Sequence, residues 1–171
     1  MLTVRFERPE DIPSVRVLNK QAFAQPVEAD IVDRLRQACT EALSLIAEEE
    51  GRVVGHILFT PAVINSGRKA IQGMALAPMA VLPERQREGI GTRLVERGLE
   101  ILGHRSCPFV IVLGHPDYYP RFGFEPASGH GIACQWEGVP DEAFMIRIFD
   151  EAVMQGVSGT ARYRDEFDDA G

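Results

Sequence analysis

Two glycines in a short polar segment give the clearest chemical signal in this sequence. Gln86-Arg-Glu-Gly89-Ile-Gly91-Thr92 follows an apolar stretch and leads into a run with helical periodicity. The first N–H groups of a helix have no partner within the helix, and the helix dipole adds positive potential at that end. Glycines lack a Cβ and let a ligand approach these amides, while Arg85 and Arg87 add cationic charge beside them. The segment therefore predicts a binding loop for a diphosphate group.

Two other phosphate-binding loops do not match the spacing. A nucleotide triphosphatase loop needs GxxxxGK[ST], and no lysine follows either Gly89 or Gly91. A dinucleotide fingerprint needs G-x-G-x-x-G after the first strand, but Leu94 occupies the third glycine position and the loop comes in mid-chain. Both functions are set aside.

The segments around the loop follow the order of an α+β domain. Alternating or continuous apolar residues indicate strands, and apolar residues recurring every three or four positions indicate helices. The patterns predict a strand at 2–6, helices at about 12–25 and 27–39, strands at 43–47, 53–59 and 70–82, a helix at 90–102, a buried strand at 109–113, a turn or short helix at 115–124, and closing strands at 133–136 and 144–149.

The loop and its two flanking strands form a crossover unit. A strand, a glycine loop, a helix and a second strand in succession place residues 79–82 and 109–113 as parallel neighbours. Pro78 cannot donate a hydrogen bond to a neighbouring strand, so the strand at 70–82 is expected to be bulged or unpaired there.

Length and charge exclude several classes of protein. The 171 residues, 45% of them hydrophobic, are expected to form a single domain, 1–171, whose acidic end at about 165–171 frays. A net charge of −7 argues against nucleic acid and membrane surfaces as partners. Three widely spaced cysteines suggest neither a disulfide framework nor a metal site, and no apolar run approaches the ~18 residues that a membrane span needs. We therefore expect a cytoplasmic protein.

The loop resembles that of a known superfamily. Gln86, Gly89 and Gly91 match each fixed position of Q/R-x-x-G-x-G/A, the pyrophosphate loop of the GNAT superfamily of acyl-CoA-dependent N-acetyltransferases. Val81-Leu-Pro83 and Tyr119-Pro-Arg-Phe-Gly-Phe124 resemble two more segments of that family. The stretches 113–124 and 158–163 resemble an uncharacterised bacterial branch that is called YhbS-like. The resemblance implies the GNAT fold, a mixed and mostly antiparallel sheet flanked by helices, with a splayed parallel pair at 70–82 and 109–113.

The resemblance also implies where the cosubstrate, acetyl-CoA, is held. In this superfamily acyl-CoA lies in the gap between those two strands. Ala80 and Val81 are expected to offer backbone groups to the pantetheine and the thioester, while loop amides hold the pyrophosphate. The implied cosubstrate-binding set is Ala80, Val81, Gln86, Arg87, Glu88, Gly89, Ile90, Gly91 and Thr92.

Two residues are candidates for catalysis. Tyr119 matches the general-acid tyrosine of the family and is expected to protonate the departing thiolate, with Tyr118 assigned to packing. The family often places a basic carboxylate on the strand before the loop, and residues 70–82 contain none. His115 lies just after the buried strand and has an ordinary pKa of about 6.5, which suits a general base, so it is the candidate base. The alternatives are that His115 is a turn residue without a catalytic role, or that a water chain carries the proton. Trp136 either borders an acceptor cleft or belongs to the core.

The resemblance predicts acetyl transfer from acetyl-CoA to a primary amine of a small molecule or peptide, through a ternary complex. A non-catalytic acyl-CoA-binding or sensing domain is the alternative, because the carboxylate is missing. An enzyme that modifies charged tRNA conflicts with the net charge of −7. The sequence does not identify the acceptor and does not decide whether the protein forms a homodimer. It predicts no metal ion.

Overall fold

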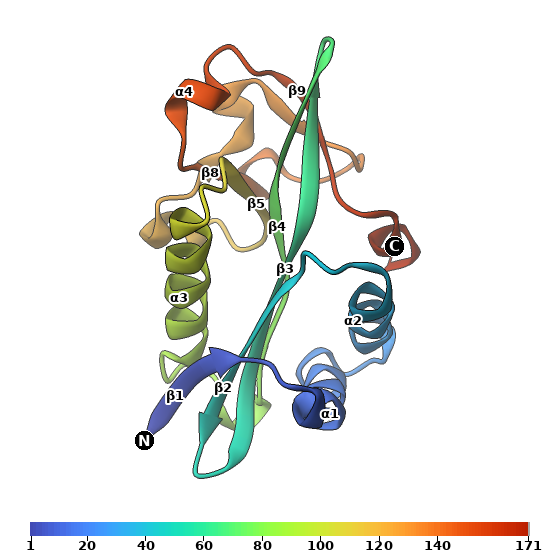
Figure 1. Cartoon of the computed structure of the whole chain (residues 1–171), viewed down its shortest axis with the longest axis vertical. Coiled ribbons are helices and arrows are strands. Elements are labelled where there is room, and N and C mark those ends of the chain that lie inside the picture. Colours follow the sequence, from blue (N-terminus) through green and yellow to red (C-terminus); the bar gives the residue numbers. More distant parts are fainter. Residues whose placement is uncertain (171) are drawn as a thin grey trace. The chain divides into compact units, whose positions relative to one another are not determined.

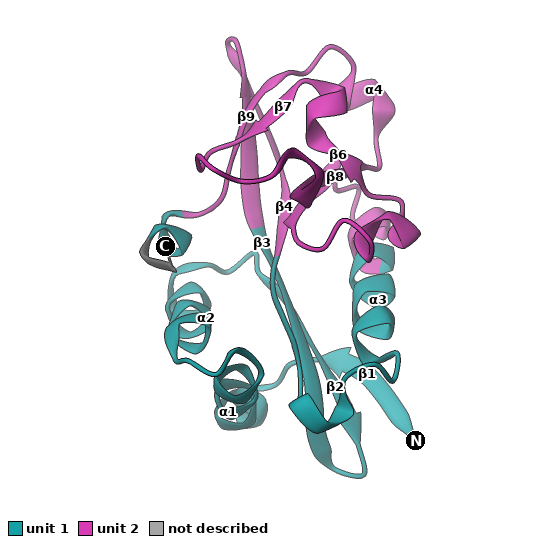
Figure 2. Cartoon of the chain, turned by 180° about the vertical axis from the view of Figure 1, so that it is seen from behind, with its two compact units in different colours: residues 1–60, 77–100, 165–171 teal, residues 61–76, 101–164 magenta. Residues whose placement is uncertain are grey.

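Two long strands pass through both of the compact units into which the chain divides (Figure 2). The structure, a computed structural model, describes the backbone of residues 1–170 and the side chains of residues 1–168. Unit 1 comprises residues 1–60, 77–100 and 165–171, and unit 2 comprises residues 61–76 and 101–164. Strands β3 (Arg52–Ser66) and β4 (Lys69–Val81) each begin in one unit and end in the other.

Unit 1 is built on antiparallel strands with helices on either side of them (Figure 1). Strand β2 pairs with β1 along one edge and with the first part of β3 along the other. The ribbon shows α1 and α2 on one side of these strands and α3 on the other. The elements are β1 (Leu2–Phe6), α1 (Ile12–Phe23), α2 (Val27–Ala38), β2 (Leu43–Glu49), the 3-10 helices η1 (Pro9–Asp11), η2 (Pro83–Arg85) and η6 (Asp165–Ala170), and α3 (Ile90–His104) up to residue 100.

A glycine sets how closely α3 packs on β3 within unit 1. A Cβ on Gly98 would lie 2.3 Å from Cε2 of Phe59, a fully buried side chain on β3. Leu94 and Val95, on the same helix, are also fully buried. This apolar face therefore holds α3, and with it the glycine loop at its N-terminus, against the sheet.

Unit 2 combines two sets of paired strands. Strand β5 is parallel to β4 and antiparallel to β8, which also pairs with β6. Strand β9 is antiparallel to the end of β3 and parallel to β7. The further elements are β5 (Phe109–Leu113), η3 (Tyr119–Phe122), β6 (Glu125–Pro126), η4 (Ala127–His130), β7 (Ile132–Cys134), η5 (Asp141–Ala143), β8 (Phe144–Ile148), α4 (Glu151–Met154) and β9 (Gly159–Arg162).

The position of the parallel pairing differs from the expected one. Strand β5 has the expected bounds, but its registered partners on β4 run from Met74 to Leu76, not over residues 79–82. The pairing ends at Leu76 and Val112, before Pro78, which has no N–H to donate. The last residues of β4 are therefore outside this ladder.

The acidic end was expected to fray. It forms η6 (Asp165–Ala170) in unit 1, with Phe167 buried and residues of η6 close to α2. One apolar side chain within the acidic run gives this segment a contact with the unit, which the charge pattern did not indicate. Residue 171, also part of the expected frayed end, lies outside the described residues.

Candidate active site

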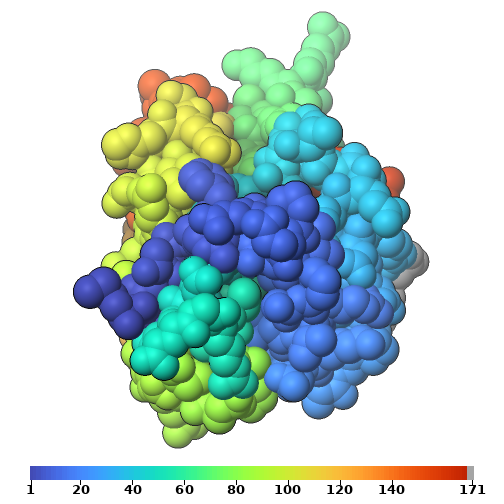
Figure 3. All heavy atoms as spheres, turned by 60° about the horizontal axis from the view of Figure 1, so that its bottom comes forward, coloured from blue at the N-terminus to red at the C-terminus, as the bar shows by residue number. Residues whose placement is uncertain are grey.

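The segment between β4 and α3 turns sharply and stays at the surface of unit 1. Helix η2 follows the end of β4, and α3 begins at Ile90. The Gln86 side chain reaches back, its Nε2 donating to the Val81 carbonyl at 3.3 Å. Figure 3 shows this yellow-green loop beside the teal turn that joins β2 to β3. The N-terminal amides of α3 are thus presented at an exposed loop, where an anion can approach them.

Gly89 is needed for its backbone conformation. Its φ is +85°, in the left-handed region that residues with a Cβ rarely adopt, and no atom lies within 4 Å of a Cβ built there. Arg87 also has a positive φ, of 65°. The space over Gly89 is therefore open, and a phosphate group can come close to the backbone.

The charges beside the loop differ from the expected pair of cations. The Arg85 guanidinium contacts Glu49 at 2.9 Å and Glu88 at 3.0 Å, and hydrogen bonds to Glu88 and then Glu49 raise the pKa of Arg85. Arg87 is exposed and makes no ion pair within the part of the chain that the structure describes. The expected cationic patch of Arg85 and Arg87 is thus wrong for Arg85, whose charge two carboxylates offset.

Ala80 and Val81 lie at the end of β4 in the same unit as the loop. Ala80 is buried, with 3% of its surface exposed, and the Val81 carbonyl accepts the Gln86 bond. Leu82 is fixed by its N–H, which donates to the Val54 carbonyl at 3.0 Å. Unit 1 therefore brings together the whole set expected to bind the cosubstrate.

Tyr119 is packed in an aromatic cluster of unit 2. Its ring centroid lies 5.1 Å from that of Tyr118 and 5.7 Å from that of Phe124. A Cβ on Gly114 would lie 2.3 Å from Cε2 of Tyr119, so the glycine after β5 makes room for this ring. Burial, and then the neighbouring Tyr118, raise the pKa of Tyr119 above its ordinary 10. Its phenol is therefore neutral at physiological pH.

His115 begins the turn that carries Tyr119. Its side chain is exposed, while its carbonyl accepts the N–H groups of Tyr118 at 3.1 Å and Tyr119 at 3.4 Å. Unit 2 thus places both candidate catalytic residues in one turn, and Tyr118 packs as expected. The Arg121 guanidinium covers the Tyr118 ring at 4.6 Å.

A family model decides what this loop and turn belong to. Residues 3–127 match the acetyltransferase (GNAT) domain. The chain belongs to the GNAT family. This match confirms the resemblance that the loop and the tyrosine segment indicated, and the mixed, mostly antiparallel sheet with flanking helices is the expected GNAT fold.

The relatives of this GNAT chain include several bacterial proteins. It is 32% identical over 167 residues to the uncharacterized N-acetyltransferase YhbS of Escherichia coli K12, covering 97% of this chain and 98% of the relative. The crystal structure of YhbS in complex with CoA has a TM-score of 0.90, over 99% of this chain and 93% of that one. A GNAT acetyltransferase from Brucella melitensis in complex with acetyl-CoA is 34% identical, with a TM-score of 0.80 and 98% of both chains covered. The uncharacterized N-acetyltransferase YjhQ of Escherichia coli K12 is 45% identical over 121 residues, 70% of this chain and 67% of the relative.

Helices that could span a membrane and clusters of metal-ligating residues are absent from the described part of this GNAT chain. Over residues 1–170, no helix is long and apolar enough to cross a membrane. The same residues hold no group of three or more His, Cys, Asp and Glu side chains placed to bind a metal ion.

Sequence reasoning offered Trp136 as a residue of an acceptor cleft or of the core, but it missed the pocket that Trp136 lines in unit 2 and the other residues around it. The pocket has a volume of about 350 Å³ and is lined in part by Trp136, Asp141 and Phe144. A larger pocket of about 880 Å³ in the same unit is lined by residues of 123–158 and by none of the expected site residues. No motif marks either pocket, because their walls come from short elements, among them η4, η5, β7, β8 and α4, and from loops between them that follow no period. A glycine directly after a buried strand, Gly114, was the one signal in the sequence for a large side chain packed there.

Proposed function

We propose that this GNAT chain transfers an acetyl group from acetyl-CoA to a primary amine of a small molecule or peptide, in a ternary complex. The observation that carries the proposal is the exposed loop at the start of α3, with open space over Gly89. Relatives that align with nearly the whole chain support it, since one was crystallised with CoA and another with acetyl-CoA.

The residues of the loop fit an anionic cosubstrate. Backbone amides from Arg87 to Thr92 would contact the pyrophosphate, and the Arg87 side chain would add the cationic charge that Arg85 does not. Gln86 and Glu88 would act indirectly: Gln86 braces the loop on Val81, and Glu88 holds Arg85. Ala80 and Val81 would offer strand hydrogen bonds to the pantetheine. Acetyl-CoA would supply an acyl group activated as a thioester.

The reaction needs a neutral amine and a stabilised thiolate. The amine nitrogen forms a bond to the acyl carbon, the carbon–sulfur bond breaks, and the proton lost by nitrogen is balanced by one gained at sulfur. We propose that Tyr119 donates a hydrogen bond to the departing sulfur. Its raised pKa keeps the phenol protonated but makes complete proton transfer to a thiolate, with an ordinary thiol pKa of about 8.5, unfavourable. The main role of Tyr119 would therefore be to stabilise the negative charge that develops on sulfur.

His115 stays a prediction as the base. Its exposed ring is free to accept a proton from the amine directly or through water, and its carbonyl positions Tyr119. Exchange of the ring for another side chain leaves that carbonyl in place. Activity of a His115→Gln variant thus reports on the ring alone.

The non-catalytic alternative is not favoured. Curated relatives over most of this chain are named N-acetyltransferases, and the family model is that of an acetyltransferase domain. We further propose that both units form one acetyltransferase domain, 1–171. This domain would act in the cytoplasm, without nucleic acid or a metal ion. Light scattering would test whether it forms a homodimer.

The test is a thiol-release assay with acetyl-CoA and a panel of primary amines. We expect acetyl-CoA to bind and CoA thiol to appear only when a suitable amine is present, with the acetylated amine identified by mass spectrometry. Binding of acetyl-CoA without transfer to any amine of a broad panel would restore the sensing alternative. Absence of binding would contradict both functions.

A further inference from the structure

A small pocket in unit 2 combines an aromatic ring, apolar side chains and a carboxylate. Its volume of about 350 Å³ is in the range that binds small molecules. Its lining includes Ile132, Cys134, Trp136, Val139, Asp141 and Phe144. Asp141, at the start of η5, is exposed, and one of its oxygens accepts the Ser128 hydroxyl at 2.7 Å. An apolar body with one polar contact thus suits this pocket.

The chain segment that lines the pocket is acidic. From Phe122 to Ile146 the chain contains no lysine or arginine, and it carries Glu125, Glu137, Asp141 and Glu142. Glu125 is bonded to His130 at 2.8 Å, whereas Asp141 makes no ion pair within residues 1–168. A ligand cation would complete this site, held by the carboxylate of Asp141 and by the ring of Trp136.

The pocket lies next to the proposed catalytic tyrosine. Phe144, which lines it, pairs with Leu113, and the Gly114 N–H donates to the Ala143 carbonyl at 3.0 Å. Gly114 in turn lies against the Tyr119 ring.

Tyr163 packs against the tryptophan of the pocket. The ring centroids of Tyr163 and Trp136 are 4.8 Å apart. Cys134, which also lines the pocket, lies on β7 and pairs in register with Ala161, two residues before Tyr163.

We propose that this pocket holds a cationic group of the acetyl acceptor, and that the acceptor carries this cation in addition to the amine that is acetylated. The proposal rests on the proposed function. A carboxylate is a much weaker base than an amine, so an ammonium bound by Asp141 keeps its proton and has no lone pair for attack. The nitrogen that is anchored and the nitrogen that reacts are therefore different atoms. Diamines and compounds with a basic side chain form the substrate class.

The single tryptophan of the chain provides a readout at the pocket itself. Trp136 is the one Trp in the sequence, so its fluorescence reports binding there without any need for activity. We expect 1,4-diaminobutane to change this fluorescence saturably, and 1,4-butanediol at the same concentrations to leave it unchanged. Equal effects of the diol would overturn the proposal.

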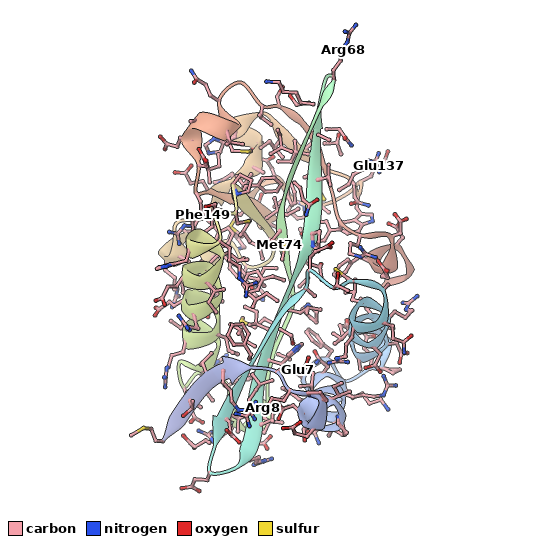
Figure 4. The ribbon with its side chains drawn as sticks, viewed as in Figure 1. Glu7, Arg8, Arg68, Met74, Glu137 and Phe149 are labelled. Atoms are coloured by element: carbon pink, nitrogen blue, oxygen red, sulfur yellow. The ribbon has the colours of Figure 1, made fainter. Side chains whose placement is uncertain are left out.

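Asp141→Asn tests the anchor with little change of shape, because an amide oxygen can still accept the Ser128 bond. We expect it to weaken diamine binding by about tenfold, as the loss of a charge-assisted contact would. Glu137→Gln is the matched control, because it removes the same charge next to Trp136 in the sequence. Figure 4 shows Glu137 at the outer edge of the segment between β7 and η5, and its side chain does not line the pocket. Equal losses in both variants would overturn the proposal, since a long-range field would then explain the effect.

Steady-state kinetics separate this inference from the proposed function. In Asp141→Asn, KM for a diamine should rise about tenfold with kcat nearly unchanged, while KM for 4-amino-1-butanol, which lacks the second cation, should not change. Acetyl transfer that does not depend on Asp141 would overturn the pocket and leave the proposed function standing. If diamines bind but no amine is acetylated, the proposed function fails, and the assignment as an acceptor site fails with it.

Discussion

Two residues carry most of the chemistry proposed for this chain, and their neighbours explain why each can do so. Gly89 adopts a left-handed conformation with open space over it, so the backbone itself can contact an anion. Tyr119 is surrounded by aromatic rings and by Gly114, which fix its ring and keep its phenol neutral. One residue provides access to the backbone, and the other provides a rigid hydrogen-bond donor.

Gly89→Glu should abolish acetyl-CoA binding, because a carboxylate would occupy the space for the pyrophosphate and repel it. The left-handed backbone adds a strain of about 1–2 kcal/mol for a residue with a Cβ. Gly51→Glu is the control, since Gly51 has a φ of +79° and open space as well, in the β2–β3 turn of the same unit. Isothermal titration should show binding to the control and none to Gly89→Glu; equal binding to both would contradict the assignment of the loop.

Tyr119→Phe should lower kcat by about 10²-fold, the lower end of the effect of removing one hydrogen-bond donor to a developing negative charge, and leave the Kd of acetyl-CoA unchanged. The ring contact with Gly114 is kept in this variant. Tyr118→Phe removes the neighbouring hydroxyl and should have little effect. Because the pKa of Tyr119 is raised, its proton is retained beyond pH 10, and the rate of the wild-type enzyme should show no loss from this group below that pH. Equal rates for Tyr119→Phe and the wild type would remove Tyr119 from catalysis.

At the scale of elements, the sequence predicted those segments whose packing follows a clear period. The bounds of β5 and the start of α3 agree with prediction because a continuous apolar run and a glycine loop mark them. The residues of β4 that pair with β5 were predicted wrongly, because a strand of 13 residues offers several registers for pairing. The sequence marked Trp136 as a residue of a cleft or of the core, but it could not choose between these, because the walls of the pocket come from short strands and 3-10 segments whose contacts local sequence does not specify.

A buried polar network joins three elements of unit 1. His56 of β3 is fully buried, with Nε2 at 2.9 Å from the Ser44 hydroxyl of β2 and Nδ1 at 3.3 Å from Asn19 Nδ2 of α1. The Asn19 amide also donates to the Val15 carbonyl, which fixes its orientation. Nδ1 of His56 therefore faces a donor, and a proton on this nitrogen would have no acceptor. Burial first, and then Arg36, lower the pKa of His56 from 6.5 to about 3.

This network predicts that the protein loses stability as the pH falls below about 6.5. The unfolded chain binds a proton at His56 near that pH and the folded chain does not, so the free energy of unfolding decreases as the pH falls towards 3. At pH 5 the loss is about 2 kcal/mol relative to pH 7, from a difference of about 1.5 pH units below 6.5. The lowered pKa of Asp11 acts below its ordinary 3.8 and does not affect this range. Urea unfolding at pH 5 and pH 7 should show this loss of unfolding free energy in the wild type and a much smaller loss in His56→Gln. Equal losses in the two proteins would contradict the role of His56.

At the scale of the whole molecule, the net charge of −7 repels an anionic cosubstrate, which must bind despite it, and attracts a cationic acceptor. The two attractions differ in range. Acetyl-CoA would be held chiefly by short contacts to backbone amides, which salt screens little, against a long-range repulsion that salt screens strongly. The acceptor would be drawn by the long-range field and by Asp141, and salt weakens both of these.

Salt should therefore shift the two specificity constants in opposite directions. Between about 0.02 M and 0.5 M salt, kcat/KM for a diamine is expected to fall several-fold, because the Debye length drops to well below 10 Å. Over the same range kcat/KM for acetyl-CoA should stay constant or rise, since screening removes the repulsion and leaves the amide contacts. Each constant is measured with the other substrate saturating, and 4-amino-1-butanol, with a single positive charge, should show a weaker dependence than the diamine. A fall of both constants together would mean that a positive local field, and not backbone amides, captures acetyl-CoA.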